Sequence, residues 1–129
     1  MNILLVEPDK LLAQIYAATL KSGGHAVVCA ATAQNAIHAA DIGVPDLVIL
    51  ELQLVSHSGI EFLYEFRSYT DWQTIPVIIL SLVPPVEFSD SRDLLMTELG
   101  VQGYHYKPRV SLAKLQRLVQ GYAAAEPAL

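Results

Sequence analysis

Cysteine is nearly absent from this chain: among its 129 residues, only Cys29 carries a thiol. A single cysteine excludes an internal disulfide, so the fold depends on a packed apolar core. Cys29 lies in the apolar run over residues 26–30, which predicts a buried and chemically inert thiol.

Long hydrophobic runs are also missing, although 53% of the residues are hydrophobic. No run reaches the roughly 18 apolar residues that a transmembrane helix needs, so we expect no membrane span. The chain begins without a basic leader and reaches an acidic side chain at Glu7, which is unlike a signal peptide. We therefore expect a cytoplasmic protein.

Charge is sparse and slightly negative. Thirteen acidic residues outnumber eight basic ones, and the net charge of −5 argues against nucleic acid as a direct partner. Four basic residues gather near the C-terminus, where a solvated helix face is commoner than a phosphate-binding patch: Lys107, Arg109, Lys114 and Arg117. The length and the apolar fraction together predict one globular domain with a substantial core.

Short apolar runs alternate with segments of helical periodicity. The runs predict strands at residues 3–6, 26–30, 47–50, 77–82 and 104–106. The periodic segments predict helices at residues 12–20, 33–42, 59–69, 89–99 and 112–122. Polar residues before the helices are expected to cap them, and a glycine is expected to end the fourth: Asp9, Thr32, Ser58, Ser111 and Gly100.

Strand followed by helix, five times over, predicts an α/β fold. We expect a (βα)5 doubly wound parallel sheet of five strands with helices on both faces. The predicted domain covers residues 1–122, and residues 123–129 form either a C-terminal tail or the start of a linker.

Chemically useful side chains follow the predicted strands. Glu7 and Asp9 follow the first, Glu51 ends the third, Ser81 lies near the end of the fourth, and Lys107 ends the fifth. The carboxyl ends of parallel strands share one edge of a sheet, so these groups are expected to converge there. Carboxylates beside a hydroxyl and a lysine suit a phosphoryl group and a hard cation such as Mg²⁺.

Four short segments carry a family resemblance. They are Ile-Leu-Leu-Val-Glu-Pro-Asp at residues 3–9, Asp-Leu-Val-Ile-Leu-Glu-Leu-Gln-Leu at 46–54, Pro-Val-Ile-Ile-Leu-Ser at 76–81 and Gly-Tyr-His-Tyr-Lys-Pro at 103–108. In this order they resemble the response-regulator receiver domain, the CheY-like module of two-component signalling, over residues 2–122. The resemblance implies a flavodoxin-like sheet of order 2-1-3-4-5.

The resemblance also implies a reaction, in which a histidine kinase transfers a phosphoryl group to an aspartate beside a bound Mg²⁺. By position, Glu51 matches the phosphoacceptor, and Ser81 and Lys107 match the phosphoryl contacts. The metal positions are Glu7, Glu51 and the backbone carbonyl of Gln53. Ser81 and Tyr104 match the conformational switch, and the alternative for Tyr104 is an edge-strand aromatic that packs on the last helix.

Three residues depart from the pattern of the family. Glu51 replaces the acceptor aspartate and moves the carboxylate one methylene outward, where a misplacement of about 1 Å can cost roughly a hundredfold in rate. Pro8 replaces the second acidic residue, so the cofactor is expected to be absent or a weakly bound Mg²⁺. Leu82 stands where a small residue is usual and is expected to crowd an incoming phosphodonor.

The leading hypothesis is therefore an atypical receiver, a pseudo-receiver rather than an enzyme, that signals through protein–protein interaction without normal phosphorylation. The extended Glu51 carboxylate is expected to accept hydrogen bonds from Lys107 and Ser81 and so to imitate part of the phosphorylated state. One alternative is a working phosphoacceptor with a weakened Mg²⁺ site. A remote alternative is a small flavodoxin-like enzyme or cofactor binder, for which the sequence lacks a glycine-rich phosphate loop.

The expected partners are a histidine kinase or another signalling protein, or an output domain, with no membrane. The resemblance places the partner surface, also a candidate homodimer interface, on the fourth helix, fifth strand and fifth helix. There the sequence presents Arg92, Asp93, Met96, Tyr104, Lys114 and Arg117.

Overall fold

Strands and helices alternate along the chain, as the apolar pattern predicts. The computed structural model describes residues 1–124. The strands are β1 (Asn2–Val6), β2 (Ala26–Ala30), β3 (Leu47–Leu50), β4 (Val77–Ser81) and β5 (Val101–Tyr106). The α-helices are α1 (Lys10–Ser22), α2 (Ala33–Ile42), α3 (Gly59–Ser68) and α4 (Leu112–Ala124). The shorter helical segments are η1 (Thr70–Trp72), η2 (Pro85–Ser91), η3 (Leu94–Glu98) and η4 (Lys107–Arg109).

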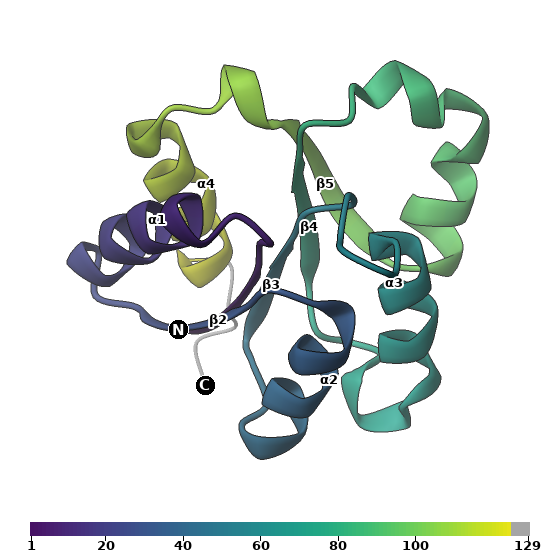
Figure 1. Cartoon of the computed structure of the whole chain (residues 1–129), viewed down its shortest axis with the longest axis horizontal. Helices are drawn as coiled ribbons and strands as arrows, with labels where there is room; N and C mark the ends of the chain where they lie inside the picture. Colours follow the sequence, from purple (N-terminus) through teal and green to yellow (C-terminus); the bar gives the residue numbers. More distant parts are fainter. Residues whose placement is uncertain (125–129) are drawn as a thin grey trace.

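The five strands form one parallel sheet of order β2-β1-β3-β4-β5, which confirms the predicted fold class and strand order. Figure 1 shows α1 and α4 on one face of the sheet and α2 and α3 on the other. Each face has its own apolar cluster, because successive strand residues point to opposite faces. Ile3, Leu5 and Ile49 pack beneath α1 and α4, whereas Leu4, Val48 and Leu50 pack beneath α2 and α3.

The predicted caps are confirmed. The side chains of Asp9, Thr32, Ser58 and Ser111 each accept a hydrogen bond of 3.1 Å from the backbone N–H three residues later. Each bond satisfies one of the donors that the first turn of a helix leaves free. These caps fix where the helices begin relative to the preceding strand ends, and therefore the shape of the sheet edge that carries the candidate site.

The segment between β4 and β5 differs from the regular helix predicted at residues 89–99. It begins earlier, as the 3₁₀ helix η2, and continues into the π-helix η3. Pro85 starts η2, and the side chains of Ser89, Asp90 and Ser91 compete with the helical backbone. Gly100 ends the segment with φ of +65°, and the Arg67 guanidinium donates to the carbonyls of Leu99 at 2.8 Å and Gly100 at 3.2 Å.

The expectation of a buried Cys29 is wrong, because its side chain is exposed. Among the strands of residues 1–124, β2 lies at the edge of the sheet and pairs with β1 alone. The run Ala-Val-Val-Cys-Ala has the composition of a central strand, and composition alone does not reveal strand order.

The C-terminal helix α4 continues to Ala124, two residues beyond the predicted domain boundary. The remainder of the predicted tail or linker, residues 125–129, lies outside the described residues. Within residues 1–124, no helix is long and apolar enough to cross a membrane.

Gly59 closes the turn that joins β3 to α3. Its N–H donates to the Leu52 carbonyl at 2.8 Å, and a Cβ at this position would lie 2.8 Å from Leu52 Cα and 2.9 Å from the Glu51 carbonyl oxygen. Since both neighbours are backbone atoms, Gly59→Ala must displace the turn, and we expect it to lower the free energy of unfolding by about 1–3 kcal/mol. Urea unfolding would measure this, with Gly43→Ala as the control, because open space surrounds Gly43. Equal effects of the two substitutions would contradict the expectation.

Candidate functional site

Four polar side chains meet at the carboxyl edge of the sheet, as the strand pattern predicts. Glu7 follows β1, Glu51 follows β3, Ser81 ends β4 and Lys107 follows β5. None of the four is more than 8% exposed. Buried charges are rare unless they are paired, so the contacts among these groups determine what the site can do.

Lys107 lies between the two carboxylates. Its Nζ donates to Glu7 Oε1 at 2.5 Å and to Glu51 Oε1 at 2.7 Å. Burial alone would lower the pKa of Lys107, but its hydrogen bonds to Glu51 and Glu7 and their negative charges outweigh burial and raise it. The ammonium therefore stays charged between the two carboxylates.

The Glu51 carboxylate accepts hydrogen bonds on both oxygens. Oε1 accepts from Lys107 and from the backbone N–H of Leu82 at 3.1 Å. Oε2 accepts from the Ser81 hydroxyl and from the backbone N–H of Gln53 at 3.2 Å. Burial acts to raise the pKa of Glu51, but these four donors together lower it. Four donors match the acceptor capacity of a carboxylate, so Glu51 is ionised and fully engaged.

Two predicted switch residues meet across Val83. The N–H of Val83 donates to Ser81 Oγ at 3.0 Å, and the Tyr104 hydroxyl donates to the Val83 carbonyl at 2.7 Å. A continuous chain of hydrogen bonds thus runs from Glu51 through Ser81 and Val83 to Tyr104. Burial is the main reason that the pKa of Tyr104 rises to about 12, so its hydroxyl remains a donor at neutral pH.

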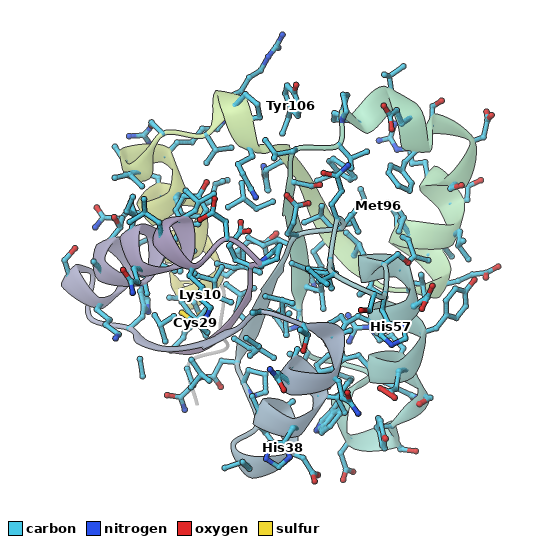
Figure 2. All side chains as sticks on the ribbon, in the orientation of Figure 1. Lys10, Cys29, His38, His57, Met96 and Tyr106 are labelled. Carbon is cyan, nitrogen blue, oxygen red and sulfur yellow. The ribbon has the colours of Figure 1, made fainter. Side chains whose placement is uncertain are left out.

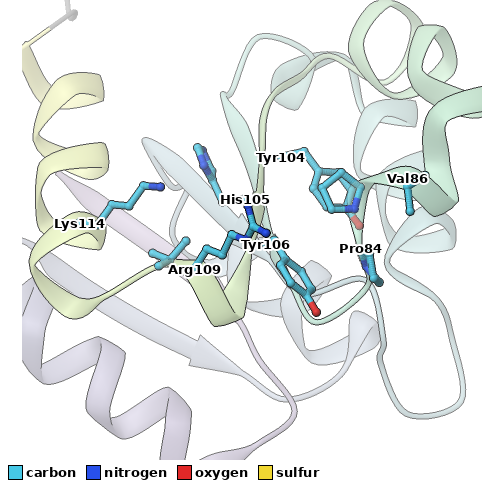
Figure 3. A pocket seen from close by; sticks show the side chains of 9 residues that line it. Pro84, Val86, Tyr104, His105, Tyr106, Arg109 and Lys114 are labelled. Atoms are coloured by element: carbon cyan, nitrogen blue, oxygen red, sulfur yellow. The ribbon is translucent and has the colours of Figure 1, made fainter.

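The Tyr104 ring packs against Phe88 of η2, at a centroid distance of 6.1 Å, and against the apolar cluster beneath α2 and α3. It does not pack on the last helix, so that alternative is wrong. The ring lines two neighbouring hollows. One, of about 420 Å³, is shown in Figure 3 and is shared with Tyr106, Arg109 and Lys114.

The second hollow beside Tyr104, of about 460 Å³, is lined by Arg92 and Met96. Most of the predicted partner surface is therefore brought together around one tyrosine, with the exposed Asp93 in the same segment as Arg92. Arg117 lies elsewhere, in a hollow with Gly23 and His25. Figure 2 shows Met96 on η3, well apart from His38 and His57, which lie far from each other on the α2 and α3 side.

The donor set at this edge does not fit a divalent cation as the residues stand. Lys107 occupies the space between the Glu7 and Glu51 carboxylates, and Pro8 supplies no carboxylate. Glu7 Oε2 accepts the N–H of Asp9 at 3.1 Å, while the Asp9 side chain caps α1. Among residues 1–124, no three His, Cys, Asp or Glu side chains are grouped to hold a metal ion. Mg²⁺ would have to displace Lys107 from both carboxylates.

Several members of this site are backbone groups that the sequence pattern did not indicate. Leu82 and Gln53 each contribute an N–H to Glu51, whereas the family resemblance implies a role only for the Gln53 carbonyl. Val83 links Ser81 to Tyr104 through its peptide groups. Only the turn geometry after β3 and β4 reveals these donors. In the sequence, only the unusual Val-Pro-Pro at residues 83–85 indicates that the loop after β4 has an altered conformation.

The chain resembles known proteins in sequence and in structure. A family model described as the response regulator receiver domain matches residues 3–120. The KDP operon transcriptional regulatory protein KdpE of Escherichia coli is 32% identical over 83% of this chain and 44% of its own length. The chain spans about half the length of the curated relatives it matches.

Solved structures share the fold. The chemotaxis protein CheY4 of Vibrio cholerae aligns with a TM-score of 0.81 and 21% identity, over 94% of this chain and 97% of that one. The receiver domain of the sensor histidine kinase PA1611 of Pseudomonas aeruginosa aligns with a TM-score of 0.79 and 26% identity, over 96% and 98%. In the PA1611 structure a magnesium ion is coordinated in the active-site cleft.

Proposed function

This chain belongs to the response regulator receiver domain family of two-component signalling, and from that premise we propose that it is an atypical receiver that signals by protein–protein interaction without normal phosphorylation. Glu51 stands in the phosphoacceptor position, and Ser81 and Lys107 stand in the phosphoryl-contact positions. The domain has no enzymatic activity of its own in this proposal.

The observation that carries the proposal is the set of four donors around the Glu51 carboxylate. Lys107, Ser81 and two backbone N–H groups all point at its oxygens. These donors are already satisfied without a phosphoryl group, so an incoming phosphate would have to displace a buried ion pair. Leaving Lys107 and Glu7 without that partner would cost several kcal/mol.

The same contacts support a permanently held switch. Glu51 fixes Ser81, which accepts the N–H of Val83, and Val83 in turn accepts the Tyr104 hydroxyl. One carboxylate carries less charge than a phosphoryl group, so the imitation of a phosphorylated site is partial. The state of Tyr104 would be set by the sequence and not by a kinase.

The proposed partners are a histidine kinase or another signalling protein, or an output domain. The partner surface comprises Arg92, Met96, Tyr104 and Lys114, which surround the two hollows beside Tyr104. The charged side chains of this surface, Arg92 and Lys114, are both basic, and charge at such a surface favours specificity more than affinity. The length of the matched relatives and the name of one, a transcriptional regulatory protein, support an output domain as one partner.

The test is a ¹H–¹⁵N correlation spectrum titrated first with Mg²⁺ to millimolar concentration and then with beryllofluoride, which imitates an acyl phosphate. We expect no saturable shift at Glu7, Gln53, Ser81, Lys107 or Tyr104, because Lys107 and the loop donors are occupied. Saturable shifts clustered at these five residues would overturn the proposal. They would favour the alternative, a working phosphoacceptor with a weakened Mg²⁺ site.

A further inference from the structure

The two edges of the sheet are protected to different degrees. At the β5 edge, the pairing with β4 shifts register beside Ile78, and the bulky side chains of Tyr104, His105 and Tyr106 lie along the strand. At the β2 edge, all five residues pair with β1 in unbroken register. Natural sheets protect open edges with charges, prolines or bulges, because an unprotected edge pairs with other strands. β2 has none of these three features.

The outward-facing backbone groups of β2 follow from its pairing with β1. Ala26 donates its N–H to the Met1 carbonyl, and the Ala30 carbonyl accepts the N–H of Glu7, both at 3.0 Å. Alternate residues of a strand direct their hydrogen-bonding groups to opposite sides. Ala26, Val28 and Ala30 therefore face β1, while the N–H and C=O groups of Val27 and Cys29 face away from the sheet.

The surface beside this edge is apolar. Val28 is 56% exposed, Ile42 at the end of α2 is 77% exposed, and Val44 just after that helix is 55% exposed. A groove of about 250 Å³ runs between β2 and the end of α2, and Ala26, Val28, Ala39 and Val44 line it. Within the described part of the chain, no charged side chain lines this groove.

We propose that β2 pairs antiparallel with β2 of a second copy of this chain, about a two-fold axis at Val28. Val28 lies midway between Val27 and Cys29, whose backbone groups face outward. In this register Val27 lies opposite Cys29 of the partner subunit, and the reverse pair forms by symmetry, giving four hydrogen bonds. Val28 then packs against Val28 of the partner subunit, and the two sheets join into one.

The absence of charge at the β2 edge favours a second copy of β2 over a charged strand as the partner. A strand that carried charges would lose their hydration against Val28 and the apolar groove, whereas a second β2 brings only Ala, Val and Cys. Ala39 and Gly43, on the side of α2 that lines the groove, are small and leave room for approach. Five residues of strand bury less than the roughly 800 Å² per partner of a stable complex, so the dimer forms only at high protein concentration.

Site-specific disulfide formation tests the register. With Cys29→Ala as background, Val28→Cys places two thiols directly opposite each other, in a pair whose Cα atoms lie about 4.5 Å apart. Ala26→Cys in the same background is the matched control, because residue 26 lies opposite residue 30 of the partner subunit. Under mild oxidation, we expect a disulfide-linked dimer from the first variant and at least tenfold less from the second. Equal cross-linking of both, or none of either, would overturn the proposal.

Sedimentation of the unmodified chain at rising concentration gives an independent reading. We expect self-association that Val28→Lys abolishes and that Met96→Lys, on the partner surface beside Tyr104, leaves unchanged. Loss of the dimer through Met96→Lys alone would assign dimerisation to that other surface and refute the β2 contact. A chain that stays monomeric at millimolar concentration would refute it as well. Neither outcome bears on Glu51, so this inference and the proposed function are tested separately.

Discussion

Replacing Lys107 by methionine is expected to lower the free energy of unfolding by about 3–5 kcal/mol at pH 7. The substitution keeps most of the apolar stem but leaves the Glu7 and Glu51 carboxylates buried, 4% and 3% exposed, without their shared cation. Removing one partner from a buried ion pair has this cost, because the remaining charge has neither water nor a counter-ion. Thermal or urea unfolding would measure the loss.

Lys114→Met is the matched control, since the same change at an exposed lysine of α4 should alter stability by no more than about 0.5 kcal/mol. Adding Glu51→Gln to Lys107→Met should restore part of the loss, because it removes one of the two uncompensated charges. Similar destabilisation by both lysine substitutions would show that the Lys107 ion pairs contribute nothing specific.

Lowering the pH from 7 towards 5 should favour the folded state of the variant relative to that of the natural chain. In the natural chain, the pKa of Glu51 is lower in the folded state than in the unfolded state. Its contribution to the free energy of unfolding is therefore present above the unfolded-state pKa and is lost as the pH falls through the folded-state pKa. The pKa of Lys107 is raised in the folded state. Its contribution to the free energy of unfolding is therefore present below the ordinary pKa of lysine and is lost as the pH rises through the folded-state pKa.

Without Lys107, burial acts to raise the pKa of Glu51 with one strong opposing donor removed. Lys107→Met should therefore lose less stability, or gain some, as pH falls from 7 towards 5, while the natural chain does not gain. Unfolding curves at several pH values would detect this difference. Parallel pH profiles for the two proteins would contradict the assigned role of the ion pairs.

The sequence predicted the sheet because its strands are nearly uninterrupted apolar runs and its helices carry explicit caps. It also predicted that Glu51 reaches Lys107 and Ser81, since that follows from strand ends and side-chain length. It did not predict that Cys29 is exposed, because composition does not tell an edge strand from a central one. The irregular η2 and η3 segment was predicted as a regular helix for a similar reason, because its apolar spacing hides the competition from Ser and Asp side chains.

Placing aspartate at positions 51 and 8 is expected to convert a site that is not phosphorylated into one that binds Mg²⁺ and accepts a phosphoryl group. Glu51→Asp shortens the side chain by one methylene, which withdraws the carboxylate from Ser81 and Leu82 and frees both donors for phosphoryl oxygens. Pro8→Asp supplies a second acidic group beside Glu7, where the proline offers no ligand. We expect the double variant to bind Mg²⁺ at least tenfold more tightly than the natural chain, a difference of about 1.4 kcal/mol.

The second measurement is phosphate incorporation from a small-molecule phosphodonor, detected by the mass of the intact protein. The natural chain is expected to incorporate none, Glu51→Asp a small fraction, and the double variant most, because the acceptor and the metal site must both be present. Glu65→Asp, the same change at an exposed position of α3, controls for phosphorylation elsewhere. Incorporation by the natural chain that equals the double variant would show that Glu51 does not block the reaction.

A double variant that binds Mg²⁺ but stays unphosphorylated would contradict the prediction and direct attention to the loop after β4. There the Leu82 side chain is exposed, and the Leu82 backbone N–H donates to Glu51. Adding Leu82→Ala to the double variant separates the two causes, since it clears the approach without touching the acceptor. Recovery of phosphorylation would assign the block to Leu82. Continued failure would mean that Pro84 and Pro85 hold the loop too far from the position that a phosphorylated aspartate requires.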